Sequence, residues 1–397
     1  MTVGILVMSI MPGAYNKIIF VPLLFLWVFF AFITSNESFI NTFVRPSLKS
    51  YAIYLWLIVY ILIYMTGYAV GIDIYLFNYM RIGFSILLFN YYIELKDINV
   101  IKRLTLISIA LICFVCISTI IVLSTNPNAA RILSTGREEL AQNINGIVGS
   151  FGFIYSLVFI CIVILGCFVE GIINKNKTLW IIIYSLFLIT IFKASFMIAL
   201  ILLTGISLSV ILRVKKFWHL LFLFLLIILF DVFCLPYISA LLLFLANSVG
   251  SDAVAQRLHE LNQFIISGNI ENTSDMGIRL KYIIMSLESF ISSPLVGVGG
   301  FYGYDTRYFG IGGHSGFLDE LARYGILGTL SLFIGLIANM KYVFKILNKK
   351  QKNIYLKCSI GFFILGFINT IFFIHIFIVF FIVVPGLLIY FNGYNYE

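Results

Sequence analysis

Apolar runs long enough to cross a membrane recur along almost the whole chain, separated by short polar connections. A membrane-spanning α-helix needs about 20 mostly apolar residues. The pattern predicts eleven spans, at residues 17–35, 48–66, 74–93, 102–123, 144–169, 178–192, 194–212, 217–235, 317–340, 354–373 and 376–394. A short apolar run over residues 1–12 would bring the number to twelve. We therefore expect an all-α, polytopic transmembrane helical bundle in which residues 1–397 form a single integral membrane domain.

One connection, between residues 235 and 317, is far longer than the others. Its first part, residues 236–249, is apolar enough to lie on the membrane interface. From Arg279 onwards, apolar residues recur at helical spacing and predict an amphipathic helix that ends before Pro294. We therefore expect residues 236–316 to form a long extracytoplasmic loop that contains short amphipathic helices.

The composition agrees with a membrane protein and leaves no room for a separate soluble domain. Hydrophobic residues make up 61% of the chain and charged residues only 11%, against about 25% charged in soluble domains. The first eleven residues have no basic region and no small-residue cleavage site, so a cleaved signal peptide is not expected. Frequent Ile, Phe, Lys and Asn are typical of an AT-rich bacterial genome. The six cysteines lie in apolar runs, where we interpret them as small hydrophobic residues.

The distribution of Lys and Arg predicts the orientation, because cytoplasmic connections carry an excess of them. One set of alternate connections holds 16 of the 26 basic residues and the other set holds nine, while Arg81 lies inside a span. We therefore expect the richer set to face the cytoplasm, and the long loop and the connection at 124–143 to face outward. The outward set is Lys17, Arg131, Arg137, Lys193, Arg257, Arg279, Lys281, Arg307 and Arg323.

These outward basic residues oppose the usual charge bias, which makes them candidates for an anion site. Arg suits phosphate because its planar fork gives two parallel hydrogen bonds. Lys193 lies alone between two apolar runs, and an ionisable residue at membrane depth is a functional candidate. The alternatives are ordinary solvated loop charges and, for Lys193, a helix-end residue that extends its amine to the interface.

A glycine-rich segment precedes His314 and then runs into an apolar span. Eight glycines between 297 and 316 favour close approach of main-chain N–H groups to a ligand, but no Gly-Lys-Ser/Thr follows as in a nucleotide loop. Ser315 is a candidate N-cap for a helix beginning near Gly316, whose positive end would favour an anion near His314. His314 itself is a candidate proton acceptor, or else a hydrogen-bonded structural residue.

Two carboxylates follow in the first turns of that helix. Asp319 and Arg323 are spaced i, i+4 and would pair on one helix face. Asp319 or Glu320 would alternatively orient His314. No pair of histidines has metal-ligand spacing and no Asp-x-Asp occurs, so we expect no metal and no cofactor.

Several of these segments together resemble the O-antigen ligase and O-antigen polymerase (Wzy-type) superfamily. They are "GIRLKYIIMSLESFISSPLVGVGGF", "GHSGFLDELARYGILG", "TIFKASFMIAL" and "RILSTGREELAQNINGIVG". In that superfamily an Arg-led helix, a Pro-Leu-Gly-x-Gly turn and a His opening the next membrane helix follow one another. Two positions depart from it: Lys193 stands where Arg is usual, and His-Ser replaces His-Asn at 314 and 315.

The resemblance implies a metal-independent membrane glycosyltransferase at the outer face of the bacterial inner membrane. Its substrate would be a glycan on undecaprenyl pyrophosphate, transferred onto a lipid-linked repeat unit by a polymerase, with membrane lipid and a chain-length regulator protein as partners and no nucleic acid. His314 would act on the acceptor hydroxyl, with Arg279 also catalytic. The basic residues Arg131, Arg137, Lys193, Arg279 and Arg323 would bind the pyrophosphate.

The sequence also fits three other functions. A ligase would transfer the glycan to lipid A-core with the same fold and site. A lipid-linked oligosaccharide flippase or other transporter fits the number of spans, although its charges would lie near the midplane and its halves would repeat. A purely structural membrane protein would not need the outward basic residues.

Overall fold

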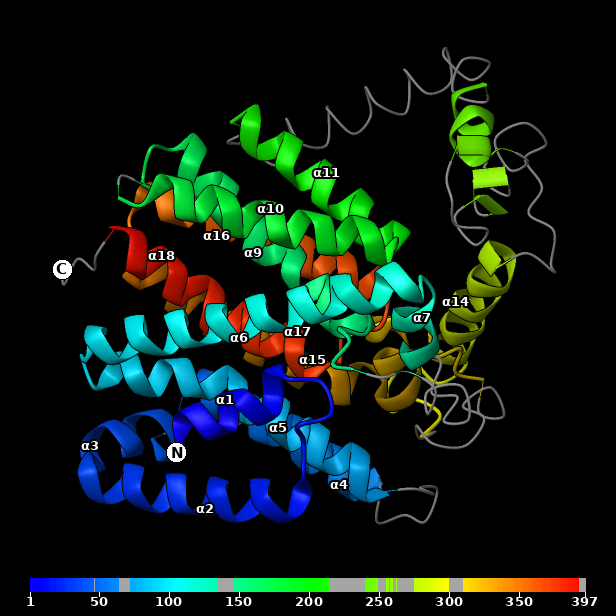
Figure 1. Ribbon diagram of the computed structural model, residues 1–397. Coiled ribbons are helices and arrows are strands. Elements are labelled where there is room, and N and C mark those ends of the chain that lie inside the picture. Colours follow the sequence, from blue (N-terminus) through cyan, green and yellow to red (C-terminus); the bar gives the residue numbers. More distant parts are fainter. Residues whose placement is uncertain are drawn as a thin grey trace.

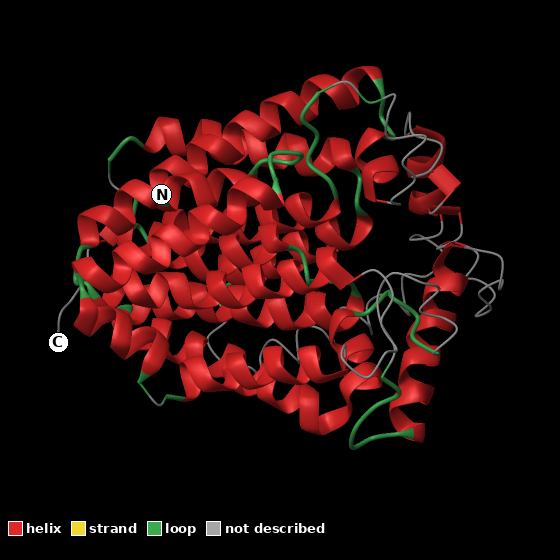
Figure 2. Cartoon of the chain, turned by 90° about the horizontal axis from the view of Figure 1, so that it is seen from below, coloured by secondary structure: helices red, strands yellow, loops and turns green. Residues whose placement is uncertain are grey.

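The computed structural model is helical throughout the part that it describes (Figures 1 and 2). Within that part there is no strand. The described residues are 1–45, 47–63, 72–134, 144, 146–173, 175–213, 240–248, 255–256, 258–259, 262, 275–299 and 310–392. The predicted span at 217–235 therefore lies outside them.

Among the described residues, two five-residue π-helices, η1 and η4, interrupt the α-helices. The first half consists of α1 (Thr2–Ile10), α2 (Lys17–Thr34), α3 (Asn36–Phe39), η1 (Ile40–Val44), α4 (Leu48–Ile63), α5 (Ile72–Glu94), α6 (Ile98–Thr125), α7 (Ala129–Ser134) and α9 (Phe151–Val169). The second half consists of α10 (Lys177–Ala194), α11 (Met197–Ile211), α14 (Asp275–Ser292), α15 (Gly316–Ile346), α16 (Lys349–Ile368), α17 (Ile374–Ile378), η4 (Val379–Val383) and α18 (Val384–Asn392).

Six of these helical segments are long and apolar enough to cross a membrane. They are α2, α6, α9, α10, α15 and the continuous run Ile374–Phe391. The apolar stretches of α4 and α11 are shorter, at Leu48–Leu62 and Ile198–Ile211, and α16 carries four lysines in its first nine residues. The protein is thus an α-helical, membrane-embedded protein, as the sequence predicts. Of the eleven or twelve predicted spans, six correspond, within the described residues, to helices that meet both the length and the hydropathy expected of a span.

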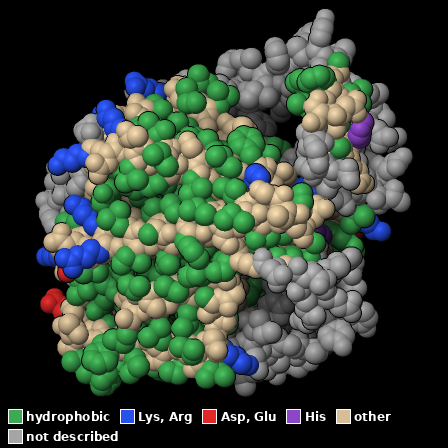
Figure 3. All heavy atoms as spheres, viewed as in Figure 1, with side chains coloured by type: hydrophobic (Ala, Val, Ile, Leu, Met, Phe, Trp, Pro, Cys, Tyr) green, Lys and Arg blue, Asp and Glu red, His purple; other side chains and the backbone are tan. Residues whose placement is uncertain are grey.

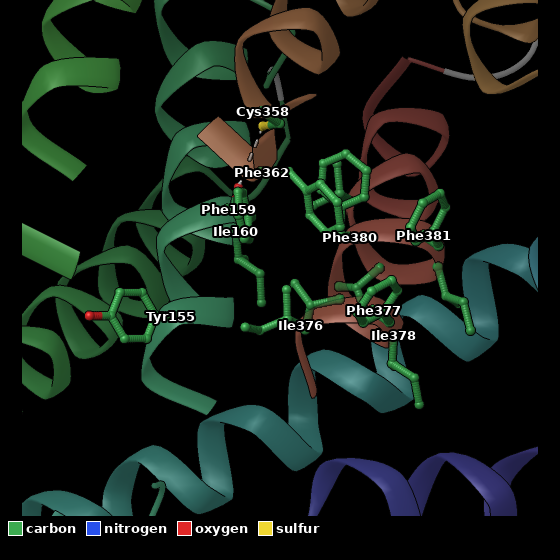
Figure 4. Close-up of a cluster of buried hydrophobic side chains, with 14 of the residues drawn as sticks. Tyr155, Phe159, Ile160, Cys358, Phe362, Ile376, Phe377, Ile378, Phe380 and Phe381 are labelled. Atoms are coloured by element: carbon green, nitrogen blue, oxygen red, sulfur yellow. Dashed lines mark hydrogen bonds between the residues drawn. The ribbon is translucent and has the colours of Figure 1, made fainter. Parts of the chain in front are cut away.

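Helix α9 packs against α10, α11, α16 and the last helical run. Almost every residue of α9 is buried, whereas α2 lies at the edge of the bundle and is mostly exposed (Figure 1). Figure 4 shows the centre of the core, where Phe159 of α9 and Phe362 of α16 face Phe377 and Phe380 of the last helical run. The Phe362 and Phe380 ring centroids are 4.4 Å apart. The exposed apolar side chains of the outer helices suit contact with lipid.

Lys and Arg side chains gather at one end of the bundle, which we call the basic end (Figure 3). There Lys49 at the start of α4 lies 3.7 Å from Glu94 at the end of α5, and Tyr342 of α15 donates a hydrogen bond to the same carboxylate. Lys350 of α16 donates to the Glu170 carbonyl after α9. These contacts bring the connections richest in Lys and Arg to the same end of the bundle. The positive-inside rule expects such connections to lie on one side of the membrane.

Candidate functional site

The candidate site lies at the opposite end of the bundle, where α14 and the loop at 310–315 meet the start of α15. Ser315 is the N-cap of α15, because its hydroxyl accepts a hydrogen bond from the Leu318 N–H at 3.3 Å. The same hydroxyl donates to the Phe367 carbonyl at the end of α16 at 2.7 Å. The predicted N-cap and the predicted helix start at Gly316 are both confirmed, and so is the amphipathic helix before Pro294, which is α14.

Asp319 fixes the main chain on both sides of His314. One carboxylate oxygen accepts from the Gly313 N–H at 3.2 Å and the other from the Ser315 N–H at 3.1 Å. Ser286 of α14 donates to the same carboxylate at 2.6 Å and accepts from the Gly312 N–H at 2.9 Å. Asp319 is fully buried, where a carboxylate is stable only with such a set of donors. Asp319 therefore holds the backbone that carries His314.

The ring of His314 stacks on Tyr282 of α14. The two ring centroids are 5.1 Å apart with an angle of 11° between the planes. Both side chains are partly exposed, and so is Arg279. Arg279, Tyr282 and Ser286 are spaced i, i+3 and i+7, which places them along one face of the helix. The structure therefore places Arg279 one helical turn before Tyr282, whose ring stacks on His314.

Helix α15 is broken at Gly325, and the turn after α14 fills the break. Gly325 has φ 61° and ψ −167°, a conformation essentially restricted to glycine. The N–H groups of Val298 and Gly299 donate to the carbonyls of Ala322 and Arg323, at 2.8 and 3.0 Å. The N–H of Ile326 donates back to the Pro294 carbonyl at 2.8 Å. The "PLVGVG" turn thus replaces the helix's own hydrogen bonds at this point.

A buried ion pair lies directly inside the break. Arg323 Nη1 is 3.2 Å from Glu320 Oε1, and both side chains are fully buried. Tyr79 donates to the same carboxylate oxygen at 2.7 Å, and the Trp56 indole donates to the other oxygen at 3.3 Å. The expected i, i+4 pair of Arg323 with Asp319 is replaced by this i, i+3 pair, because Asp319 is turned toward the His314 loop.

Two predicted site roles are not supported by this arrangement. Arg323 has no exposed surface in the structure, so its guanidinium does not face a space that a pyrophosphate can enter. Glu320 is held by Tyr79, Trp56 and Arg323, and it is not directed at His314. Of the two carboxylates predicted to orient His314, only Asp319 contacts the loop that carries it, by accepting hydrogen bonds from the main chain on either side of His314.

The predicted basic residues Arg131 and Lys193 lie together around the turn between α10 and α11. Arg131 of α7 donates to the Ser195 carbonyl at 2.9 Å, and Lys193, which is exposed, donates to the Ser124 hydroxyl at the end of α6 at 2.6 Å. Ser195 has a positive φ of 53° and ends α10. Arg137 lies outside the described residues.

A chain of contacts connects this corner with the start of α15. Phe196, next to Ser195, packs on Phe151 and Tyr155 of α9 with centroids 5.5 and 6.2 Å apart. The Tyr155 hydroxyl accepts from the Asn369 amide at 3.1 Å, and the Asn369 carbonyl accepts from the Gly316 N–H at 3.0 Å. Arg131 and Lys193 are therefore at the same end of the bundle as Arg279 and His314, with aromatic side chains between the two groups.

Arg81 of α5 lies apart from these residues, against the end of α1. Its guanidinium donates to the Met8 carbonyl at 3.1 Å and stacks on Tyr15, 3.9 Å from the ring centroid. Sequence reasoning singled out Arg81 but missed Tyr282, Ser286, Tyr79 and Trp56. Tyr282 and Ser286 are detectable as the polar side of α14 in register with Arg279, whereas Tyr79 and Trp56 leave no local signal.

No family model matches the chain, and no curated protein matches its sequence. Within the described part of the chain, no three His, Cys, Asp or Glu side chains gather as metal ligands would.

Proposed function

We propose that this protein is a surface-polysaccharide polymerase of the O-antigen type, acting in the bacterial inner membrane. It would move a growing glycan from undecaprenyl pyrophosphate onto a lipid-linked repeat unit at the outer face. The observation that carries the proposal is a partly exposed His314 whose backbone is held on both sides by buried Asp319, next to the helix face that bears Arg279. The order of motifs, which resembles that of the superfamily, supports the same assignment.

The proposed reaction is a displacement at the anomeric carbon. The acceptor hydroxyl oxygen forms the new glycosidic bond, the bond from the anomeric carbon to the pyrophosphate oxygen breaks, and the hydroxyl proton goes to His314. A base in hydrogen-bond reach contributes about 10²- to 10⁴-fold to such a step. The leaving pyrophosphate gains negative charge, which fixed cations stabilise in the transition state. Arg279 would bind it directly, and Arg131 and Lys193 supply further positive charge at this end of the bundle.

The proposed orientation follows from the distribution of charge. With the basic end in the cytoplasm, α14, the His314 loop and the α10–α11 turn face the outside, where lipid-linked repeat units are presented. The chain-length regulator and the membrane lipid would be its partners there. A ligase would use the same residues to transfer the glycan onto lipid A-core, so the two functions are distinguished by their reaction products.

Surface glycan of a strain that carries the gene can be compared on a gel after deletion of the gene and after complementation with wild type or variants. We expect deletion to leave single-repeat glycan only, and neither His314→Ala nor Arg279→Ala to restore the ladder of polymer on a gel. The reason is that the first variant removes the proton acceptor and the second a cation on the leaving group. Matched controls are His259→Ala, an exposed histidine elsewhere, and Lys281→Ala, an exposed cation two residues from Arg279 on α14. Both should restore the ladder.

Two outcomes would contradict the proposal in different ways. Full ladders from both site variants, with their amounts in the membrane equal to wild type, would exclude these residues from the chemistry. Loss of the single-repeat species after deletion, with lipid-linked polymer accumulating on its carrier, would identify a ligase instead.

A further inference from the structure

Helix α14 carries an apolar stripe that faces away from the rest of the protein. Leu280, Ile284, Leu287 and Ile291 are 46%, 44%, 41% and 66% exposed. Their spacing of i, i+4, i+7 and i+11 places all four on one helix face. A monomeric soluble surface rarely carries such a continuous apolar row without a partner.

The opposite face of α14 is the one that contacts the site. Tyr282 stacks on His314, Ser286 binds Asp319, and Ser289 donates to the Gly310 carbonyl at 2.6 Å. Because these residues hold α14 against the loop and α15, the stripe points outward. In Figure 1 the helix lies at the end of the bundle and runs steeply across the spanning helices rather than along them.

The turn after α14 extends this apolar surface to the exposed apolar side of α15. Leu295 and Val296, in the turn after α14, are 61% and 63% exposed. The Leu327 N–H donates to the Leu295 carbonyl at 3.1 Å, so this turn lies directly beside the exposed Leu327 and Leu330 of α15. Since α15 is long and apolar enough to cross the membrane, its exposed apolar side contacts acyl chains.

We propose that α14 lies in the interfacial layer of the bilayer, with its stripe inserted among the acyl chains of the leaflet. An amphipathic helix at the membrane surface buries its apolar face at the boundary between headgroups and acyl chains. Lys281 and Glu288, both exposed on the flank of the stripe, would then lie among the headgroups. This position of α14 holds Arg279, Tyr282 and His314 at the depth of the lipid headgroups, whatever reaction the protein performs.

Fluorescence quenching in nanodiscs tests the proposal on the full-length protein. Ile284→Cys and Lys281→Cys are labelled with an environment-sensitive fluorophore, and labelled wild type corrects for the native cysteines. The quenchers are a phospholipid spin-labelled near the top of its acyl chain, and aqueous iodide. We expect lipid to quench position 284 several-fold more strongly than position 281, and iodide to show the reverse order.

Three results would overturn the proposal. Strong iodide quenching at both positions would place α14 in water. Stronger lipid quenching at 281 than at 284 would mean that the flank with Lys281, rather than the stripe, lies in the bilayer. Protection of position 284 from both quenchers, with cross-linking between copies through Ile284→Cys, would identify a second copy of the chain as the occupant. Leu287→Cys repeats the measurement on the same stripe if Ile284→Cys does not elute as folded protein.

Discussion

Replacing Arg323 by Met should remove most of the folded protein from the membrane. The substitution leaves the fully buried Glu320 carboxylate with only Tyr79 and Trp56 as donors and takes away its cation. Breaking a buried ion pair on one side costs about 3–5 kcal/mol, which is a large part of the stability of a typical domain. The measurement is the amount of monodisperse protein in detergent and the temperature at which half of it is lost on heating.

The double variant Glu320→Gln with Arg323→Met separates the ion pair from the packing of the arginine. A neutral amide still accepts from Tyr79 and no longer needs a cation, so the double variant should recover roughly half or more of the stability lost in Arg323→Met. If the double variant is as unstable as the single one, the arginine contributes by packing and not by its charge. Wild-type stability of Arg323→Met itself would contradict the buried pair.

Replacing Gly297 by Ala should detach the "PLVGVG" turn from α15, whereas Gly299→Ala should have a much smaller effect. Both residues have positive φ, 71° and 73°, so both alanines cost about 1–2 kcal/mol from the backbone alone. A Cβ on Gly297 would in addition lie 2.4 Å from the Arg323 carbonyl group, while a Cβ on Gly299 meets nothing within 4 Å. The measurement is again thermal loss of monodisperse protein.

Because main-chain atoms cannot rotate away as a side chain can, the turn has to move off the helix in Gly297→Ala. That movement breaks the hydrogen bonds to the Ala322 and Arg323 carbonyls and displaces the helix start that holds His314. We therefore expect the Gly297→Ala variant to fail in ladder synthesis under the proposed function, and Gly299→Ala to succeed. Equal effects of the two substitutions on stability would mean that the turn does not pack on α15 as the structure shows.

The local features of this site were predictable from the sequence. Ser315 as the N-cap, Gly316 as the start of α15, and the amphipathic α14 that ends before Pro294 all follow from signals within a few residues. The same holds for the membrane-embedded helical character, which depends on composition and on run length alone. The grouping of the basic connections at one end also agrees with counting Lys and Arg along the chain.

Only the tertiary structure decided which carboxylate serves which partner. A helix offers Arg323 both Asp319 at i−4 and Glu320 at i−3, and the spacing alone led us to expect the pair with Asp319. The choice came from Tyr79 and Trp56, which are more than 240 residues away and hold Glu320, and from Ser286, which draws Asp319 to the His314 loop. Short-range signals specify where helices begin and end, but buried polar groups are satisfied by whatever the packing of distant helices brings within hydrogen-bond distance.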